Sequence, residues 1–414
     1  MRFAHIADCH IGAWRDSKMR ELNFLQFKLS IEKILEEHKK SKISFAIIAG
    51  DLFNTSVPSI EALKLVTEQL KRLKDNKIEV IGVAGSHDYS STGKTMLEVL
   101  EKADLFYDLM KADIENKKLF LKFKNIDGIK ITGISGKKGS LEKKFYNSLD
   151  YDSLDKISKP KIFVFHSAIE EFKPEEFASM EATPLALLPK NFNYYAGGHI
   201  HYRFVKETLE GTICFPGPTC PNNFKEWEDL ESGSIAIVNL ENDKIKVNIE
   251  KIEALKTKSI KLNISNLNPE SIEEKIKSNL IDIDNKLILL RLEGELVNTK
   301  LSDIKFNEIN KLAEKKGAYH ILRNTSKINS NKIELKEFKS KEINEIEDEI
   351  IQELLKDSKL KNLNKQDIEI NEQSKFIKEI MNKLSNEKIE GETNLDFEER
   401  IEKEFDALIK RFEE

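Results

Sequence analysis

The sequence predicts an α/β sandwich of mixed sheets, followed by a small αβ unit and C-terminal helices. Strands and helices alternate at long spacing in the first hundred residues, and short strands with turns follow them. Fourteen of 17 glycines and eight of nine prolines lie before residue 235. Because loops rich in special backbone geometry are where chemistry concentrates, we expect the working domain there.

The length and composition indicate a protein of two or three domains in a reducing cytoplasm. With 414 residues, 39% of them hydrophobic and 34% charged, the chain buries ample core, and no apolar run approaches the ~18 residues of a membrane helix. The N-terminus enters a strand-like run at once, so we expect no secretory signal. Cys9, Cys214 and Cys220 form no CxxC pattern, which favours reduced thiols.

The net charge of -5 is unevenly spread along the chain. From Lys336 to Glu414 there are 15 basic and 23 acidic residues, which gives -8 and leaves +3 for residues 1–335. An acidic tail therefore masks a weakly basic body, and the net charge does not exclude a DNA-binding face.

Apolar spacing assigns the elements in order. We expect the first strands at 1–7, 43–49 and 78–84 and the helices that alternate with them at 20–39, 57–73 and 93–103, the second helix with Pro58 near its first turn. Shorter strands are expected at 119–123, 129–134, 161–165, 193–196, 212–215, 234–238 and 245–249.

Side chains of the kinds that bind metals fall just after these strands, where the ligand sites of open α/β sheets lie. They are Asp8, His10, Asp51, His87, His166, His199 and His201. Each short motif alone, the pair His199 and His201 included, is more often incidental. The ordered set predicts a metal site, whereas His5 lies inside its strand and is expected to be a core or supporting histidine.

Two cations at such a site suit phosphodiester hydrolysis. One Asp carboxylate has two oxygens and is able to bridge two ions, which at ~3.5–4 Å separation stabilise both the attacking and the leaving oxygen. His87 is suited to stabilise the transition state or protonate the leaving oxygen, an effect typically worth ~10²–10⁴-fold. Asp88 is either a partner that orients His87 or a simple turn residue.

The order of these residues resembles the calcineurin-like metallophosphoesterase superfamily, whose motifs appear here as Asp8-x-His10, Gly50-Asp51, Gly85-x-His87-Asp88, His166 and Gly198-His199-x-His201. The opening His5-Ile-Ala-Asp-Cys-His-Ile-Gly12, with Gly50-Asp-Leu-Phe53 and Pro216-Gly217, is similar to the SbcD nuclease family. The archaeal and eukaryotic members of that family are the meiotic-recombination-eleven nucleases of double-strand-break repair. The resemblance implies a four-layer α/β/β/α sandwich with two metal ions, usually manganese.

The resemblance also implies a role for each residue. Asp8, His10 and His201 hold the first metal, Asp51 bridges, His166 and His199 hold the second, and His87 acts on the phosphate. Ser86 stands where the family has an Asn ligand, so we expect a looser second site. Asn54 stands where many members have a His thought to support exonuclease action, which puts exonuclease strength in doubt more than endonuclease action.

We expect three domains: a metallophosphoesterase nuclease domain at 1–255, a small αβ unit at 256–335 and an acidic helical region at 336–414. The αβ unit is expected to contain strands near 260–264, 287–292 and 320–322 and helices near 271–280 and 301–316. The resemblance implies that this unit is the capping domain that presents DNA to the nuclease. An accessory domain without that role is an equally weighted alternative.

The acidic region is expected to hold helices near 343–355 and 376–384 and a last helix with an apolar stripe at helical spacing. The stripe consists of Phe397, Ile401, Phe405, Leu408, Ile409 and Phe412. Such stripes usually pack on their own domain, but a polar linker isolates this one. The resemblance implies a partner for it, the coiled-coil ATPase of the SbcC or Rad-fifty type.

Two further surfaces are expected to make contacts. Arg15, Lys18 and Arg20 follow the first metal motif and are placed to contact the phosphate backbone of DNA. Lys137 and Lys138 lie in a lysine-rich loop that is a second candidate for contact with DNA phosphates. The alternative is that this loop contacts only solvent. In the family the region of the second and third helices forms a homodimer. Plain core packing is the alternative for these helices.

Together these observations predict a manganese-dependent DNA endonuclease and exonuclease of double-strand-break repair, working with the ATPase in the prokaryotic cytoplasm near the nucleoid. Two alternatives stand beside it. One is a phosphatase or phosphodiesterase of the same superfamily that acts on small-molecule or protein phosphate esters. The other is a non-catalytic scaffold with a degraded second metal site.

Overall fold

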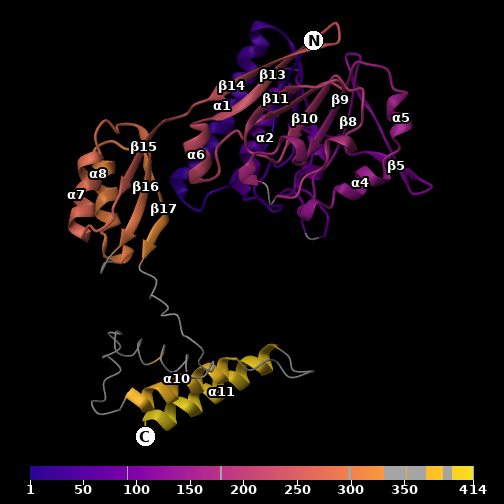
Figure 1. Cartoon of the computed structure of the whole chain (residues 1–414). Coiled ribbons are helices and arrows are strands. Elements are labelled where there is room, and N and C mark those ends of the chain that lie inside the picture. Colours follow the sequence, from indigo (N-terminus) through magenta and orange to yellow (C-terminus); the bar gives the residue numbers. More distant parts are fainter. Residues whose placement is uncertain are drawn as a thin grey trace. The chain divides into compact units, whose positions relative to one another are not determined.

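The computed structural model shows two compact units, Met1–Ser330 and Asn331–Glu414 (Figure 1). Each unit is described by itself below. The expected domain boundaries at residues 255 and 335 stay predictions. The structure describes residues 1–90, 92–177, 180–296, 300–330, 351, 370–385 and 394–413.

The first sheet has six strands in the spatial order β14–β13–β1–β2–β3–β4. Strands β1, β2, β3 and β4 run parallel, and β13 and β14 are antiparallel additions at the edge. In chain order the strands are β1 (Arg2–Ile6), β2 (Ile43–Ala49), β3 (Glu79–Val83), β4 (Tyr107–Asp108), β13 (Gly233–Glu241) and β14 (Lys244–Ile252).

The second sheet also has six strands, in the order β11–β12–β10–β9–β8–β7. Its central strands β12, β10, β9 and β8 are parallel neighbours, and a separate hairpin joins β5 (Ala112–Glu115) to β6 (Lys118–Leu121). The strands are β7 (Lys124–Ile126), β8 (Ile129–Ile134), β9 (Lys161–His166), β10 (Tyr194–Gly198), β11 (Arg203–Glu207) and β12 (Thr212–Pro216).

Alternating side chains place the two sheets face to face. Ile47 of β2 and Val164 of β9 belong to one buried cluster between the sheets, whereas their neighbours Ile48 and Phe163 point to outer clusters. Successive strand residues point to opposite faces, so each sheet has one inner and one outer face. This arrangement confirms the expected α/β/β/α sandwich.

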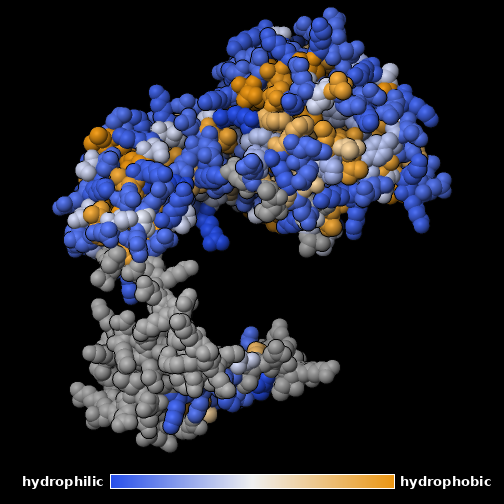
Figure 2. All heavy atoms as spheres, viewed as in Figure 1, coloured by the Kyte–Doolittle hydropathy of each residue, from blue (hydrophilic) through white to orange (hydrophobic). Residues whose placement is uncertain are grey.

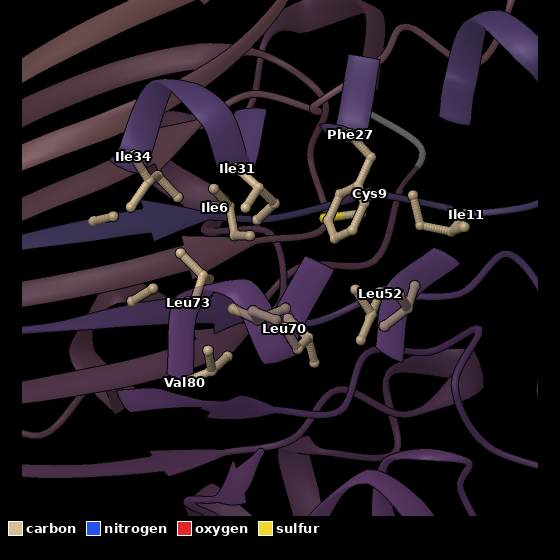
Figure 3. Close-up of a cluster of buried hydrophobic side chains, with 14 of the residues drawn as sticks. Ile6, Cys9, Ile11, Phe27, Ile31, Ile34, Leu52, Leu70, Leu73 and Val80 are labelled. Carbon is tan, nitrogen blue, oxygen red and sulfur yellow. The ribbon is translucent and has the colours of Figure 1, made fainter. Parts of the chain in front are cut away.

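Helices cover the outer faces. The outer face of the first sheet is covered by α1 (Ser17–Lys40), α2 (Ile60–Asp75) and α3 (Leu97–Lys102), and that of the second by α4 (Lys143–Ser148) and α5 (Tyr151–Asp155). Figure 3 shows the cluster under α1 and α2, where Phe27 and Ile31 of α1 and Leu70 of α2 surround Ile6 of β1. These helices fix the strands whose ends carry the metal-type residues.

Helix starts follow local capping. The side chain of Asp16 accepts a hydrogen bond from the N–H of Met19, and that of Ser59 from the N–H of Ala62, so α1 and α2 begin just after them. Helix α3 is shorter than the expected 93–103, because Thr95 pairs with Tyr89 in an isolated β-bridge before the helix starts.

Residues 256–330, which we call the small αβ part, contain a three-stranded parallel sheet in the order β15–β16–β17 with two helices on it. Two short expected strands prove longer, because β16 and β17 pair along most of their length. The elements are β15 (Lys256–Asn263), α7 (Pro269–Asn279), β16 (Lys286–Leu296), α8 (Phe306–Lys315) and β17 (His320–Ser330).

In the second unit the described residues include α10 (Ile370–Leu384) and α11 (Asn394–Glu413), which pack on each other. Lys383 of α10 pairs with Glu404 of α11 at 3.0 Å. In the predicted stripe Leu408 is buried, and Phe397, Ile401 and Phe405 are half-buried. The stripe thus packs partly within its own unit. The expected helix at 343–355 lies outside the described residues, apart from Ile351.

The surface seen in Figure 2 is mostly hydrophilic, with patches of hydrophobic residues over the first 330 residues. Ile60, the first residue of α2, is largely exposed, and so are Val57, which precedes the helix, and Val99 of α3. The homodimer expected through these helices stays a prediction. No helix within the described parts of the chain is long and apolar enough to cross a membrane.

Candidate metal centre

The predicted metal-type residues come together at the carboxyl ends of strands in both sheets. Asp8 and His10 follow β1, Asp51 follows β2, and His87 follows β3, all from the first sheet. From the second sheet, His166 ends β9, and the pair His199 and His201 follows β10. Parallel strands deliver their ends to one edge, which is why residues far apart in sequence meet here.

The loops at this edge have an unusual backbone. Asp8, His10, Asp51 and His199 have φ values of 52°, 42°, 50° and 100°, in the left-handed region that most residues other than glycine avoid. Hydrogen bonds hold the first two loops together: the N–H of His10 donates to the carbonyl of Asp51 at 2.9 Å, and that of Asp8 to Gly50 at 3.1 Å. Backbone strain of this kind is concentrated at functional sites.

Two glycines allow the close approach of these loops. A Cβ on Gly50 would lie 2.1 Å from Nδ1 of His166, and one on Gly85 would lie 2.2 Å from Oδ1 of Asp51. Both distances are shorter than any real contact, so only glycine fits beside these side chains. The motif Gly50-Asp51 therefore reflects packing as well as turn geometry.

The side chains form three overlapping groups in which the ligand atoms lie within 4.8 Å of one another. These groups are Asp8–His10–His201, His10–Asp51–His87 and Asp51–His166–His199. Asp51 belongs to the second and third groups and His10 to the first and second, so the three groups form one continuous cluster. The first and third groups match the ligand sets that the family resemblance implies.

Two of the histidines are oriented through Nδ1. His166 donates from Nδ1 to the carbonyl of Ala49 at 2.8 Å, and His201 donates from Nδ1 to a carboxylate oxygen of Glu226 at 3.0 Å. Each ring thus turns Nε2 toward the centre, where Nε2 of His201 lies 3.1 Å from Nε2 of His10. Metal-binding histidines are held in this way, with the second ring nitrogen donating to a carboxylate or a carbonyl.

The electrostatics divide the histidines into two kinds. Burial lowers the pKa of His10 to about 3 and that of His199 to about 4, so both are neutral at pH 7. Burial also lowers the pKa of His166, but the charge of Asp51 and a hydrogen bond to Asp51 raise this pKa to about 10. For His201 the hydrogen bond to Glu226 and the charge of Asp8 outweigh burial and raise the pKa to about 9.

The donor set fits divalent cations. Asp8 is fully buried, and its Oδ2 has no hydrogen-bond partner among the residues that the structure describes. A buried carboxylate oxygen without a donor is costly unless a cation faces it. Imidazole and carboxylate together are ligands for zinc, iron or manganese. The protons on His166 and His201 occupy the nitrogens that cations would otherwise take.

His87 lies at the exposed edge of the site, with its ring centroid 4.8 Å from that of His10. Its Nδ1 donates to the carbonyl of Asn54 at 2.9 Å. The orienting role considered for Asp88 is not what the structure shows. The buried carboxylate of Asp88 instead accepts from the N–H groups of Phe53, at 3.1 Å, and Gly85, at 2.8 Å.

Asp88 therefore fastens two of the site loops to each other. Burial first, and then the charge of Asp51, raise the pKa of Asp88 to about 7. Ser86 is half-buried in the same loop, between Gly85 and His87. Its short side chain stands at the position where the family has Asn.

The predicted DNA-binding residues have different surroundings. Arg15 and Lys138 are exposed, and Arg20 is half-buried. Lys18 donates to a carboxylate oxygen of Glu314 at 2.7 Å, which ties α1 to α8 and compensates its charge. Lys137 lies over the ring of Tyr89 at 3.5 Å, and burial lowers its pKa. Arg15 and Lys138 are thus the more available cations of the five.

Sequence reasoning missed Glu226, the acceptor for His201. It lies on α6 (Phe224–Leu230), seven residues long and too short for a periodicity signal. One local signal exists: the side chain of Asn223 accepts from the N–H of Glu226, which marks a helix start with Glu in its first turn. Nothing in that signal indicates contact with His201.

The calcineurin-like phosphoesterase family model matches residues 1–203. The DNA double-strand break repair protein Mre11 of Methanocaldococcus jannaschii is 30% identical over 273 residues, which cover 64% of this chain and 69% of that protein. The chain belongs to the Mre11 family of calcineurin-like phosphoesterases.

Other members of the Mre11 family match more briefly. The protein of the same name from Methanopyrus kandleri is 29% identical over 239 residues, or 55% of this chain, and that from Methanococcus maripaludis is 29% identical over 232 residues, or 52% of this chain. The chain spans about half the length of these two relatives, 51% and 55%. Among solved structures, a dimetal phosphatase from Danio rerio aligns with a TM-score of 0.42 at 12% identity, over 61% of this chain and 96% of that one.

Cation binding at this site is expected to release protons. Metals bind neutral imidazole, and without ions His166 and His201, with pKa values of about 10 and 9, carry protons at pH 7. A raised pKa means that protons compete with the cation until the pH exceeds it. Affinity for Mn²⁺ should therefore rise between pH 6.5 and 8.5, by about tenfold per pH unit for each proton released.

Calorimetric titration of the metal-free protein with Mn²⁺, in two buffers of different ionisation enthalpy, measures the protons released. The same titration of His38→Gln, a histidine at the far end of α1, serves as the control. An affinity independent of pH, with no proton released, would contradict the prediction.

Proposed function

We propose that this protein is a manganese-dependent DNA nuclease of double-strand-break processing. The observation that carries the proposal is the continuous cluster of carboxylates and imidazoles in which Asp51 lies between His10 on one side and His166 and His199 on the other, with exposed His87 at its edge. Membership of the Mre11 family supports DNA as the substrate, because the relatives are named as DNA double-strand break repair proteins.

In this proposal Asp8, His10 and His201 hold one cation, His166 and His199 hold the other, and Asp51 bridges them. Bound cations would neutralise the phosphodiester and stabilise the charge on the attacking and leaving oxygens. The protein itself holds the ligands in place, because backbone hydrogen bonds fix the loops that carry them.

His87 is the residue that we assign to the substrate. Its hydrogen bond from Nδ1 to Asn54 fixes the ring and leaves Nε2 at the open edge of the site. From there a protonated ring is able to donate a hydrogen bond to the phosphate or a proton to the leaving oxygen. Because His87 also lies within reach of Asp51 and His10, a direct ligand role is the competing assignment.

The variant His87→Ala is expected to keep both ions and to lose turnover by ~10²–10⁴-fold, the range that general acid–base catalysis supplies. The assay is cleavage of circular single-stranded DNA and of end-labelled duplex DNA with Mn²⁺. Bound ions are counted by calorimetry on the same preparation, and His38→Gln is the control.

Two results would overturn these assignments. Loss of one ion in His87→Ala makes His87 a ligand. A wild-type protein that hydrolyses p-nitrophenyl phosphate but cuts neither DNA is a phosphatase and not a nuclease.

We propose that the two cation sites differ in strength, because Ser86 replaces the family's Asn on the second site. A Ser hydroxyl reaches less far than an amide oxygen. Ser86→Asn should therefore tighten the weaker Mn²⁺ site by about tenfold, or about 1.4 kcal/mol, and leave the tighter site unchanged. Mn²⁺ titration followed by electron paramagnetic resonance measures both constants. Equal affinities in the wild-type protein would refute the proposal.

The second unit is proposed to bind a coiled-coil ATPase of the SbcC or Rad-fifty type. Half-buried Phe397 and Ile401 leave part of the α11 stripe open beside α10, where Met381 is also about half exposed. An apolar helix face of this kind fits a partner helix. The acidic charge of the region would set its orientation on a basic partner.

The double variant Phe397→Ser/Ile401→Ser should weaken ATPase binding by more than about 2 kcal/mol, the scale of an interface hot spot. The matched control is Glu402→Ser/Asp406→Ser, which changes two exposed residues of the same helix. Biolayer interferometry with the purified ATPase measures affinity, and circular dichroism checks that the helices persist. Unchanged binding with intact helices removes this surface from the proposal.

A further inference from the structure

Three consecutive residues of α6 contact three different parts of the first unit. Glu226 accepts hydrogen bonds from His201 at 3.0 Å and from the N–H of Asn222 at 2.7 Å. Trp227 is fully buried in a cluster with Met19 and Leu22 of α1, which Leu287 and Leu289 of β16 also join. One short helix thus contacts the metal centre, the core and the small αβ part at once.

The next residue, Glu228, completes the link. Its carboxylate accepts two hydrogen bonds from Arg291 of β16, one from Nε at 2.9 Å and one from Nη2. The guanidinium of Arg291 also lies 5.1 Å from the ring centroid of Phe224, the first residue of α6. A two-point carboxylate–guanidinium contact fixes direction as well as distance, so α6 and β16 are held in a defined orientation.

We propose that Glu226 is a positioning residue for His201 and that α6 couples this histidine to the small αβ part through Glu228 and Arg291. The coupling is mechanical. Glu226 and Glu228 share the backbone of one seven-residue helix, and the buried indole of Trp227 leaves it little room to tilt. A displacement of β16 therefore changes where the carboxylate of Glu226 stands.

The carboxylate of Glu226 fixes the orientation of the His201 ring. An imidazole without a partner at Nδ1 is able to flip or to change tautomer, and its Nε2 is then lost to the first cation site. With Glu226 in place, Nε2 of His201 faces His10 and the site. Through this contact the small αβ part helps to set the affinity of the first cation site.

This inference rests on the proposed two-cation site but not on DNA as the substrate, so it is tested by metal binding. Free Mn²⁺ is followed by electron paramagnetic resonance during titration of the full chain. Glu226→Ala should weaken the tighter site by about 10–100-fold, the effect of losing such an outer partner. Glu226→Gln should recover part of this loss, because its amide oxygen still accepts from Nδ1.

The coupling is tested with Arg291→Met, which keeps the aliphatic stem and removes the guanidinium. It should weaken the same site by about two- to tenfold, and adding it to Glu226→Ala should produce little further loss, since residues that act through one another are non-additive. The matched control is Lys261→Met, which breaks an ion pair with Glu293 inside the small αβ part.

The possible results test the cation site, the positioning role of Glu226 and the coupling separately. A wild-type protein that binds fewer than two ions refutes the proposed cation site itself. Two ions in wild-type with equal binding by Glu226→Ala refute the positioning role. Additive losses, or an Arg291→Met variant that behaves as Lys261→Met does, refute the coupling. If Glu226→Ala fails to fold, Glu226→Gln and Arg291→Met decide the matter.

Discussion

The centre is organised around one buried carboxylate, that of Asp51. The backbone carbonyl of Asp51 accepts a hydrogen bond from the N–H of His10 at 2.9 Å, and Oδ1 of its carboxylate accepts one from the N–H of His87 at 2.8 Å. The loops after β1 and β3 are thereby fixed to the loop after β2. The other oxygen lies 3.2 Å from Nε2 of His166. A buried carboxylate is costly without donors or cations around it, so this residue sets both the geometry and the charge of its surroundings.

The charge pattern explains how four histidines lie close together beside buried carboxylates. His10 and His199 stay neutral through burial, while His166 and His201 carry protons beside Asp51, Asp8 and Glu226. The protonated rings balance the buried carboxylates.

Much of this arrangement was predictable from the sequence, because the strand ends that carry the clustered residues are marked by short local patterns. Apolar runs that break at Asp8, Asp51 and His166 mark strand ends, and parallel strands bring such ends together. What was not predictable depends on the path of the chain. Glu226 reaches His201 only because α6 folds back over it, and Lys18 meets Glu314 across 296 positions. A basic side chain in the first turn of a helix is usually solvent-exposed, and nothing nearby in sequence indicates the distant partner of Lys18.

The left-handed backbone at four of the clustered residues also bears on the stability of the folded protein. Glycine adopts these angles without strain, where other residues lose about 1–3 kcal/mol, and the four positions are Asp8, His10, Asp51 and His199. The side chains that form the cluster are therefore present at a cost to the free energy of folding, which the packing of the two sheets around them has to offset.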